Sequence, residues 1–404
     1  MVGKRVKVLR KRRLYSCLIR CLAAYIIVAL TGFSQVGAAP AGVTSPVADT
    51  IRIGGNFDLS GRYAYFGEMA VLGAKLAFKE ANDAGGVLGR KIEFVPLDNA
   101  SDKAKAAVVM KNLVARGNVS AVLGCLSVAN TSAAYVIAEQ NRIPLVSPTA
   151  GGFILTGSDG KVKPYAFLTC FSAHSQAGYL ARFAFEELGA KKAAIVYDDK
   201  ADFSRMMVTV FEQVFAASGG KIVAKVQIGS GGEASQEYVA QIRQAEPEVV
   251  FIPLIYREAG QTIRGLRESG IGAPLLGPDM WDSPRIVAYA GEEALNDIYY
   301  FYQYAASKIL PKVDKFFEAF EKEYRRPPGS EAAMGYEAAV VLVEAIRKAG
   351  SADPESVRAA LEGIEAEGLL GKIRIDAADH NVVKSVTVHR MIEGQSFPYR
   401  MLKP

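Results

Sequence analysis

From Ile51 onward, short runs rich in β-branched and aromatic residues alternate with longer stretches in which apolar residues recur every three or four positions. The runs RIGGNFDL, KIEFVPLD, SAVLG and IPLVSP predict strands. The stretch 66–82 predicts a helix with one apolar face, formed by Phe66, Met69, Ala70, Gly73, Leu76 and Ala77. This alternation is typical of βαβ units, so we expect parallel sheets with right-handed crossovers.

The second part of the chain repeats the first. The segment IPLVSPTAGG is followed much later by APLLGPDMWD, and GRKIEF has its counterpart in GGKIVAK. The offset is 130 at three matched pairs, namely Lys91 and Lys221, Pro144 and Pro274, and Pro148 and Pro278. A period of this length indicates two similar domains. We therefore predict an α/β fold of two doubly wound, Rossmann-like lobes, with ligand-binding loops at the carboxyl ends of their strands.

The repeat ends near Tyr299. Beyond it, YYFYQYAA predicts a strand, 313–325 and 331–348 predict helices, and Asp353-Pro354 is typical of a helix start. The late strands KIRID, SVTVHR and PYRML have no earlier counterpart, so we expect them to complete both lobes by further crossings of a multi-strand hinge. The expected division is residues 51–168 plus 302–370 for lobe 1, and residues 169–301 plus 371–404 for lobe 2.

The amino end carries the basic charge of the chain. Residues 1–38 hold 8 of the 48 Lys and Arg residues and none of the 42 Asp and Glu residues, so the remainder is slightly acidic. The apolar run CLAAYIIVAL suits a cleavable signal peptide, with cleavage after Ala38 or Ala41, and an uncleaved membrane anchor is the alternative. A periplasmic location follows from export, and no nucleic-acid partner is indicated.

Motifs for catalysis, cofactors and metals are missing from the sequence. There is no G-x-S-x-G or G-x-x-x-x-G-K-[ST] motif, and the glycines of AGGVLGRK precede a strand instead of following one. The three histidines are far apart, and we expect Cys125 and Cys170 to be buried thiols. We therefore predict no enzyme activity, no cofactor and no metal; a hydrolase is the least favoured alternative.

The loops expected at the carboxyl ends of the strands carry polar and aromatic residues. Ser127, Asn130 and Thr131 open a helix, whose N-terminus suits a ligand carboxylate, and plain N-capping is the alternative. The backbone of SPTAGG adds accessible N–H groups. In the second repeat, Asp279 could hold an ammonium group or simply form a turn, and Trp281 shares its loop. The aromatic residues of these loops contact a ligand or pack within the loop.

At these loops the sequence resembles the leucine/isoleucine/valine-binding family of type I periplasmic binding proteins, the receptors of amino-acid ABC transporters. The resemblance runs from Ile51 to the carboxyl end, through DLSGRYAYFGE, GGVLGRKIEFVPLDN, IPLVSPTA, VYDD and LLGPD in that order. It implies a carboxylate-binding wall at Ser127–Thr131 and Thr149–Gly151, and an acid at Asp279 for the α-ammonium. The implied ligand-binding set is Tyr65, Phe66, Ser127, Val128, Asn130, Thr131, Thr149, Ala150, Gly151, Phe203, Tyr256 and Asp279.

Three departures from the family pattern weaken the case for leucine itself. Val128 and Ala129 stand where amino-acid binders usually keep serines, and Phe203 stands where a tyrosine is frequent. In the resemblance, Phe203 or its neighbour Asp202 matches the aromatic residue that closes from the second lobe. We expect a monomeric receptor that captures a small amino acid or related carboxylate and passes it to a membrane permease. The alternatives are a ligand-sensing subunit of a signalling system, or a receptor for aromatic acids or amides.

Overall fold

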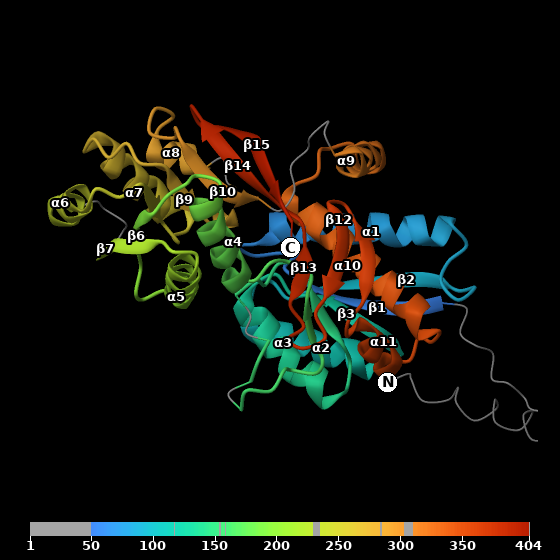
Figure 1. The fold of residues 1–404 in the computed structure, drawn as a ribbon. Coiled ribbons are helices and arrows are strands. Elements are labelled where there is room, and N and C mark those ends of the chain that lie inside the picture. The colour runs from blue at the N-terminus through green and yellow to red at the C-terminus, as the bar shows by residue number, and fades with distance from the viewer. Residues whose placement is uncertain are drawn as a thin grey trace, which may run out of the picture. The chain divides into compact units, whose positions relative to one another are not determined.

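The computed structural model describes residues 50–403, apart from residues 117, 153–154, 158, 229–234, 283–284 and 303–309 and the side chain of Asp202. The predicted signal peptide at residues 1–38 lies outside the described residues. The described chain forms two large sheets and one small sheet, with helices packed against them (Figure 1). None of the helices in this part of the chain is both long enough and apolar enough to cross a bilayer.

The first large sheet has five parallel strands in the order β2-β1-β3-β4-β5. Its strands are β1 (Thr50–Phe57), β2 (Lys91–Asp98), β3 (Val119–Gly124), β4 (Leu145–Ser147) and β5 (Ala166–Leu168). The helices that alternate with them, or pack beside them from later in the chain, are α1 (Ala64–Asp83), α2 (Lys103–Ala115), α3 (Val128–Gln140), α9 (Pro311–Tyr324), α10 (Ser330–Ala349) and α11 (Pro354–Leu361). We call this sheet with its helices the first lobe.

The second large sheet has seven strands in the order β15-β14-β10-β9-β8-β6-β7. Its strands are β6 (Lys192–Tyr197), β7 (Lys221–Gln227), β8 (Val249–Phe251), β9 (Leu275–Gly277), β10 (Ile298–Tyr302), β14 (Val386–Ile392) and β15 (Gln395–Leu402). With them pack α4 (Ala173–Glu186), α5 (Asp202–Ala217), α6 (Gln236–Ala245), α7 (Tyr256–Glu268), the 3-10 turn η1 (Asp279–Trp281) and α8 (Arg285–Ala290). We call this sheet with its helices the second lobe.

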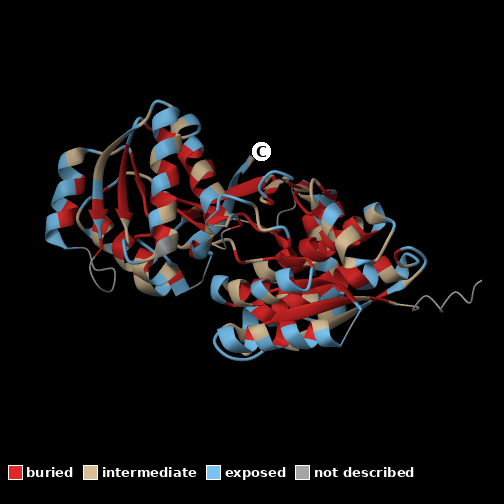
Figure 2. Cartoon of the chain, turned by 90° about the horizontal axis from the view of Figure 1, so that it is seen from below, coloured by how far each residue is buried: buried red, intermediate tan, exposed pale blue. Residues whose placement is uncertain are grey.

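The strand orders confirm the predicted repeat. The order β7-β6-β8-β9-β10 in the second sheet matches β2-β1-β3-β4-β5 in the first, strand for strand. Lys91 begins the edge strand β2, and Lys221 begins the equivalent edge strand β7. Figure 2 shows buried residues gathered on the strands and on the helix faces turned toward them, as expected for parallel sheets covered on both faces.

Three segments of the chain connect the two lobes, and this confirms the predicted multi-strand fold class. They follow β5, β10 and the small strand β13 (Val382–Lys384). Phe171 in the first segment and Phe301 at the second pack edge to face, with ring centroids 5.0 Å apart. Lys384, at the end of β13, lies over Phe171 and forms a 2.7 Å ion pair with Glu337, and both partners of the pair are buried. The described residues that flank the connections therefore pack together.

The expected lobe boundary at residue 371 differs from the strand pairing. Strands β11 (Glu365–Gly368), β12 (Gly371–Ile375) and β13 form a separate antiparallel sheet, and only β14 and β15 join the seven-stranded sheet. Ile373 and Ile375 are buried in the same core cluster as residues of α10 and α11. The short turn from β11 to β12 keeps the two strands paired, so the chain enters the second sheet only at Val386.

Candidate functional site

All twelve candidate residues follow the carboxyl ends of parallel strands. In the first lobe they lie in the first turns of α1 and α3, at the N-cap of α3 and in the loop beyond β4. In the second lobe they lie in the first turns of α5 and α7, and in η1 after β9. Open α/β sheets bind ligands at this edge because the loops there vary freely while the strands hold them in place. The candidate residues thus lie where the fold offers a site.

The start of α3 combines a helix N-terminus with an exposed apolar side chain. Ser127 is the N-cap residue, and its hydroxyl accepts a hydrogen bond from the backbone N–H of Asn130 at 3.2 Å. Val128 in the first turn remains 41% exposed. Gly124 brings the loop close to β1, since an added Cβ would lie 2.1 Å from the carbonyl oxygen of Asn56 and its φ is +126°. The backbone of this turn therefore presents the positive end of the helix dipole.

The side chains of Asn130 and Thr131 point into the protein. The Asn130 amide donates to Asp58 at 3.1 Å and to Asn99 at 3.3 Å, and Asn130 is only 3% exposed. The Thr131 hydroxyl donates to the carbonyl oxygen of Ser127 at 2.8 Å. Both side chains hold the loop, so the backbone around them is the part of this segment that can face a ligand.

The loop beyond β4 is tied to the start of α3. The Thr149 hydroxyl donates to the carbonyl oxygen of Leu126 at 3.0 Å, and the backbone N–H of Ala150 donates to the hydroxyl of Ser147 at 3.1 Å. An added Cβ on Gly151 would lie 2.5 Å from the carbonyl oxygen of Phe171, so this position requires glycine. The structure thus brings Ser127, Thr149 and Gly151 into one continuous wall.

Two aromatic rings project from the first turn of α1. Tyr65 is 58% exposed and Phe66 is 43% exposed, and their rings meet edge to face with centroids 5.6 Å apart. Gly67 allows α1 to start close to β1, because an added Cβ would lie 2.0 Å from the carbonyl oxygen of Asp58. Exposed aromatic rings at a sheet edge of this kind offer an apolar surface to a ligand.

The aromatic candidates of the second lobe are partly buried. Phe203, in the first turn of α5, packs against the main core cluster. Tyr256 begins α7, and its hydroxyl accepts a hydrogen bond from Arg285 at 3.4 Å. Its ring lies 6.2 Å from that of Tyr289. Each residue leaves part of its ring at the sheet edge, where ligand contact stays a prediction.

The loop after β9 carries Asp279 on a single 3-10 turn. The backbone N–H of Asp279 donates to the side chain of Gln176 at 3.1 Å. Of the two roles considered for the aromatic residues of these loops, Trp281 has the packing role: it is fully buried, and its indole N–H donates to the carbonyl oxygen of Leu254 at 3.0 Å. The ring fills the space above Gly277, where an added Cβ would lie 2.1 Å from it. Trp281 thus supports the turn that presents Asp279.

Two acidic residues near Asp279 were missed by the sequence analysis. Burial raises the pKa of Glu331 to about 7, and the charges of Asp282 and Asp279 act in the same direction. Burial also raises the pKa of Asp282, against hydrogen bonds from Ser330 and Tyr302. Only the folded structure shows this group. In the sequence, Glu331 is an acid in the first turn of a predicted helix, a common position that indicates no special role.

A hydrogen bond joins the two lobes next to this acidic group. The Ser330 hydroxyl, at the start of α10, donates to the Asp282 carboxylate just after η1, at 2.8 Å. A Cβ added to Gly329 would lie 3.3 Å from the Glu331 carboxylate and 3.8 Å from the Tyr65 hydroxyl. Tyr65 therefore lies beside Gly329, the residue before Ser330, which bonds to the second lobe.

Two exposed apolar residues at the same sheet edge were also missed. Ile255, the N-cap of α7, is 41% exposed, and Met280 in η1 is 39% exposed. Each stands directly beside a candidate, Tyr256 or Asp279. A cap position occupied by isoleucine, where polar residues are preferred, is the sequence signal that could have identified the first of them.

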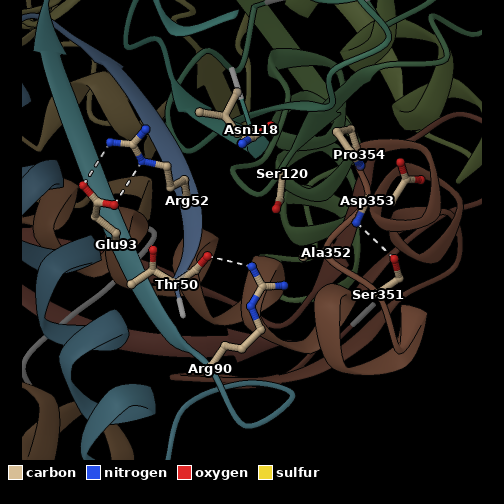
Figure 3. Close-up of a pocket in the computed structure, with 11 residues that line it drawn as sticks. Thr50, Arg52, Arg90, Glu93, Asn118, Ser120, Ser351, Ala352, Asp353 and Pro354 are labelled. Carbon is tan, nitrogen blue, oxygen red and sulfur yellow. Dashed lines mark hydrogen bonds and ion pairs between the residues drawn. The ribbon is translucent and has the colours of Figure 1, made fainter. Parts of the chain in front are cut away.

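The cavity in Figure 3 lies at the opposite edge of the first sheet. It measures about 570 Å³ and is lined by residues at the amino ends of β1 and β3 and by the start of α11. Arg52 pairs with Glu93 at 3.0 Å, and Arg90 donates to the carbonyl oxygen of Thr50 at 2.7 Å. None of the twelve candidate residues lines this cavity, so it is separate from the candidate site.

The described residues show no group of three or more His, Cys, Asp and Glu side chains arranged to hold a metal ion. Cys125 and Cys170 are buried free thiols. Burial raises the pKa of Cys170 to about 12, so this thiol carries no charge at neutral pH.

Comparisons with known proteins agree with this architecture. A family model described as "Periplasmic binding protein" matches residues 50–395. The leucine-, isoleucine-, valine-, threonine- and alanine-binding protein of Pseudomonas aeruginosa is 27% identical over 332 residues, which cover 82% of this chain and 87% of that protein.

Solved structures give the same result. The branched-chain amino acid transporter substrate-binding protein LivJ from Streptococcus pneumoniae, in complex with isoleucine, is 30% identical, with a TM-score of 0.71 over 88% of this chain and 100% of that chain. A solute-binding protein of an ABC transporter from R. palustris, in complex with benzoate, is 25% identical, with a TM-score of 0.68 over 88% of this chain and 97% of that chain. The chain therefore belongs to the periplasmic binding protein family, among the relatives of the leucine/isoleucine/valine-binding proteins.

Proposed function

We propose that this protein is an extracytoplasmic receptor that captures a small amino acid or a related carboxylate between its two lobes. The first lobe holds the ligand carboxylate at the start of α3 and the loop beyond β4. The second lobe holds the ammonium group at Asp279. A ligand that contacts both lobes binds the closed form more tightly than the open form, and this difference in affinity drives closure.

The observation that carries the proposal is the difference in charge between the two edges. The edge of the first lobe presents a helix N-terminus capped by Ser127, and the edge of the second lobe presents Asp279 on the turn above Trp281. A zwitterion matches this pair because its two charged groups have opposite preferences. The relatives named for amino-acid binding support the same assignment.

An aromatic acid is the second candidate ligand. Tyr65 and Phe66 are exposed at the first edge, and Ile255 and Met280 at the second. The relative from R. palustris was solved with benzoate. A ligand of this class would use the carboxylate wall and the apolar side chains, and it would leave Asp279 without a role in binding.

Delivery to a membrane permease and export to the periplasm complete the proposal. The relatives of known structure include a protein named as a transporter substrate-binding protein and one named as the solute-binding protein of an ABC transporter. The basic and apolar segment at residues 1–38 is the export signal in this view. We propose that a single copy of the protein presents its closed form to the permease.

The test is titration calorimetry of residues 42–404 against the common amino acids and against aromatic acids that lack an amine. Asp279→Asn should weaken amino-acid binding about 100-fold, because it removes one partner of a charge pair. Asp102→Asn is the matched control, since it makes the same charge change at an exposed N-cap position that asparagine also satisfies. Equal binding by both variants would assign the site to ligands without an amine.

A further inference from the structure

A buried polar network lies directly beneath the start of α3. Asn56, Asp58 and Asn99 are fully buried, and Asn130 is 3% exposed. The Asn99 amide donates to Asn56 at 3.1 Å and to Asp58 at 3.3 Å, and the Asn130 amide donates to Asp58 and Asn99. The network joins the carboxyl ends of β1 and β2 to the first turn of α3. It therefore underlies the wall assigned to the ligand carboxylate.

Asp58 is the single acid of this network, and its partners donate hydrogen bonds to it. Besides the two amides, the backbone N–H of Leu126 donates to its carboxylate. Burial raises the pKa of Asp58, and the hydrogen bond from Asn99 opposes that rise. Hydrogen-bond donors stabilise the charged form of a carboxylate and so offset part of the cost of burying it. The Asp58 carboxylate thus contacts the backbone of Leu126, one residue before the N-cap of α3.

The charge of Asp58 acts on the groups around it. Burial raises the pKa of the Cys125 thiol well above its ordinary value, and the Asp58 carboxylate raises it further. Cys125 is the second residue before Ser127, so the field of Asp58 acts on the segment that leads into α3. Because the surrounding protein is a medium of low dielectric, this interaction is screened less than one between surface charges.

We propose that Asp58 is a specificity-determining residue that lowers the affinity of the first-lobe wall for a ligand carboxylate and so makes the amine contact at Asp279 necessary for capture. The inference rests on the proposed function. The Asp58 carboxylate already accepts donors at the positive end of α3, so a ligand carboxylate at the same end meets a like charge. An amino acid offsets that cost through its ammonium group, whereas a simple carboxylic acid has no group to do so.

A purely structural role for Asp58 gives a different expectation. If Asp58 only holds the loop, replacing it weakens the binding of every ligand that uses the wall. If its charge selects ligands, replacing it strengthens the binding of ligands with a carboxylate and leaves their neutral analogues nearly unchanged. A comparison of a carboxylate ligand with its amide separates the two roles, because the two ligands have almost the same shape.

The experiment measures dissociation constants for the amino acid that binds most tightly, for its carboxamide and for benzoate. The proteins are the parent chain of residues 42–404, Asp58→Asn, Asp58→Ser and Asp102→Asn. Asp58→Ser removes the charge without setting a new amide against those of Asn99 and Asn130. Asp102→Asn makes the same charge change at an exposed position of the same sheet edge.

The expected result is that both Asp58 variants raise the affinity for the amino acid about tenfold relative to its carboxamide, and raise the affinity for benzoate by a similar factor. Asp102→Asn should leave both quantities unchanged. An unchanged ratio of amino acid to carboxamide in both Asp58 variants overturns the inference but not the proposed function. Failure of the parent chain to bind any amino acid or benzoate overturns the proposed function and this inference with it.

Discussion

The loops after β4 and β9 occupy equivalent places in the two repeats, yet their chemistry differs. Each donates a side-chain hydrogen bond to a backbone carbonyl in the loop after the preceding strand of its sheet. In the first lobe, Thr149 donates to Leu126 at 3.0 Å, and in the second lobe Trp281 donates to Leu254 at 3.0 Å. Both repeats therefore have a side-chain hydrogen bond between neighbouring loops, which we call the tie, but a different side chain donates it in each repeat.

The residues at the end of each strand follow from this difference. Ser147 ends β4, and its hydroxyl bonds with Cys125 and with the backbone of Ala150. Gly277 ends β9, since the ring of Trp281 fills the space that a side chain would take. The loop held by Thr149 presents mainly backbone groups, whereas the loop held by Trp281 presents the acids Asp279 and Asp282. The same frame thus provides two walls of opposite preference.

Removing the tie made by Trp281 should cause the largest loss of stability. Trp281→Ala is expected to lower the free energy of unfolding by about 4 kcal/mol, because it leaves a cavity in the core and an unpaired carbonyl at Leu254. Chemical denaturation followed by circular dichroism measures this change. Trp281→Phe keeps most of the volume and should lose much less. Equal losses in the two variants would contradict the role assigned to packing.

The sequence was sufficient to predict the frame of both repeats. The constant offset predicted that Lys91 and Lys221 hold equivalent places, and they begin the equivalent edge strands β2 and β7. This prediction succeeded because βαβ units of similar length produce the same strand order. Local signals also served at helix starts. Asp353 caps α11, and its carboxylate accepts a hydrogen bond from the backbone N–H of Ser356 at 3.0 Å. These features depend on neighbours in the sequence.

The direction of side chains at the site could not be predicted in the same way. Asn130 turns inward because Asp58 and Asn99, which are 72 and 31 residues earlier, provide its partners. Trp281 turns inward because Gly277 leaves room for its ring. Glu331 joins the acidic group through the approach of a helix from the other lobe. Each depends on contacts made only after the strands have paired.

The acidic group formed by Asp279 and Asp282 of the second lobe and Glu331 of the first lobe gives the next prediction, which concerns pH. In the unfolded chain Glu331 loses its proton near its ordinary pKa of 4.5, but in the folded protein it does so at about 7. The protein therefore loses stability as the pH rises through this range. Glu331→Gln should remove that loss. At pH 8 the free energy of unfolding of the variant should be about 2 kcal/mol higher than that of the parent, and at pH 4 the two should be almost equal.

Glu355 provides a contrast of opposite sign. The hydrogen bond from Arg142 lowers the pKa of Glu355, so its contribution to stability is present near neutral pH and is lost as the pH falls. Glu355→Gln should therefore destabilise the protein at pH 7 and have no effect in strong acid. Urea denaturation at several pH values measures both variants. A Glu331 variant that follows the same trend as the Glu355 variant would contradict the burial argument.

Removing the tie made by Thr149 in the first lobe should cause the smallest loss of stability. Thr149→Val keeps the shape of the side chain but removes the hydroxyl that donates to Leu126, so we expect a loss of about 1 kcal/mol in unfolding free energy. Thr209→Val is the matched control, because Thr209 is exposed on α5 and its hydroxyl donates to the carbonyl of Arg205 within the same helix. Thermal denaturation of the two variants measures the difference.

Because the Thr149 tie also aligns the wall around Ser127, its loss should weaken the binding of a carboxylate ligand several-fold, and Thr209→Val should leave binding unchanged. Equal stability and binding in the two variants would mean that the Thr149 tie, unlike the Trp281 tie, is not needed to hold its edge.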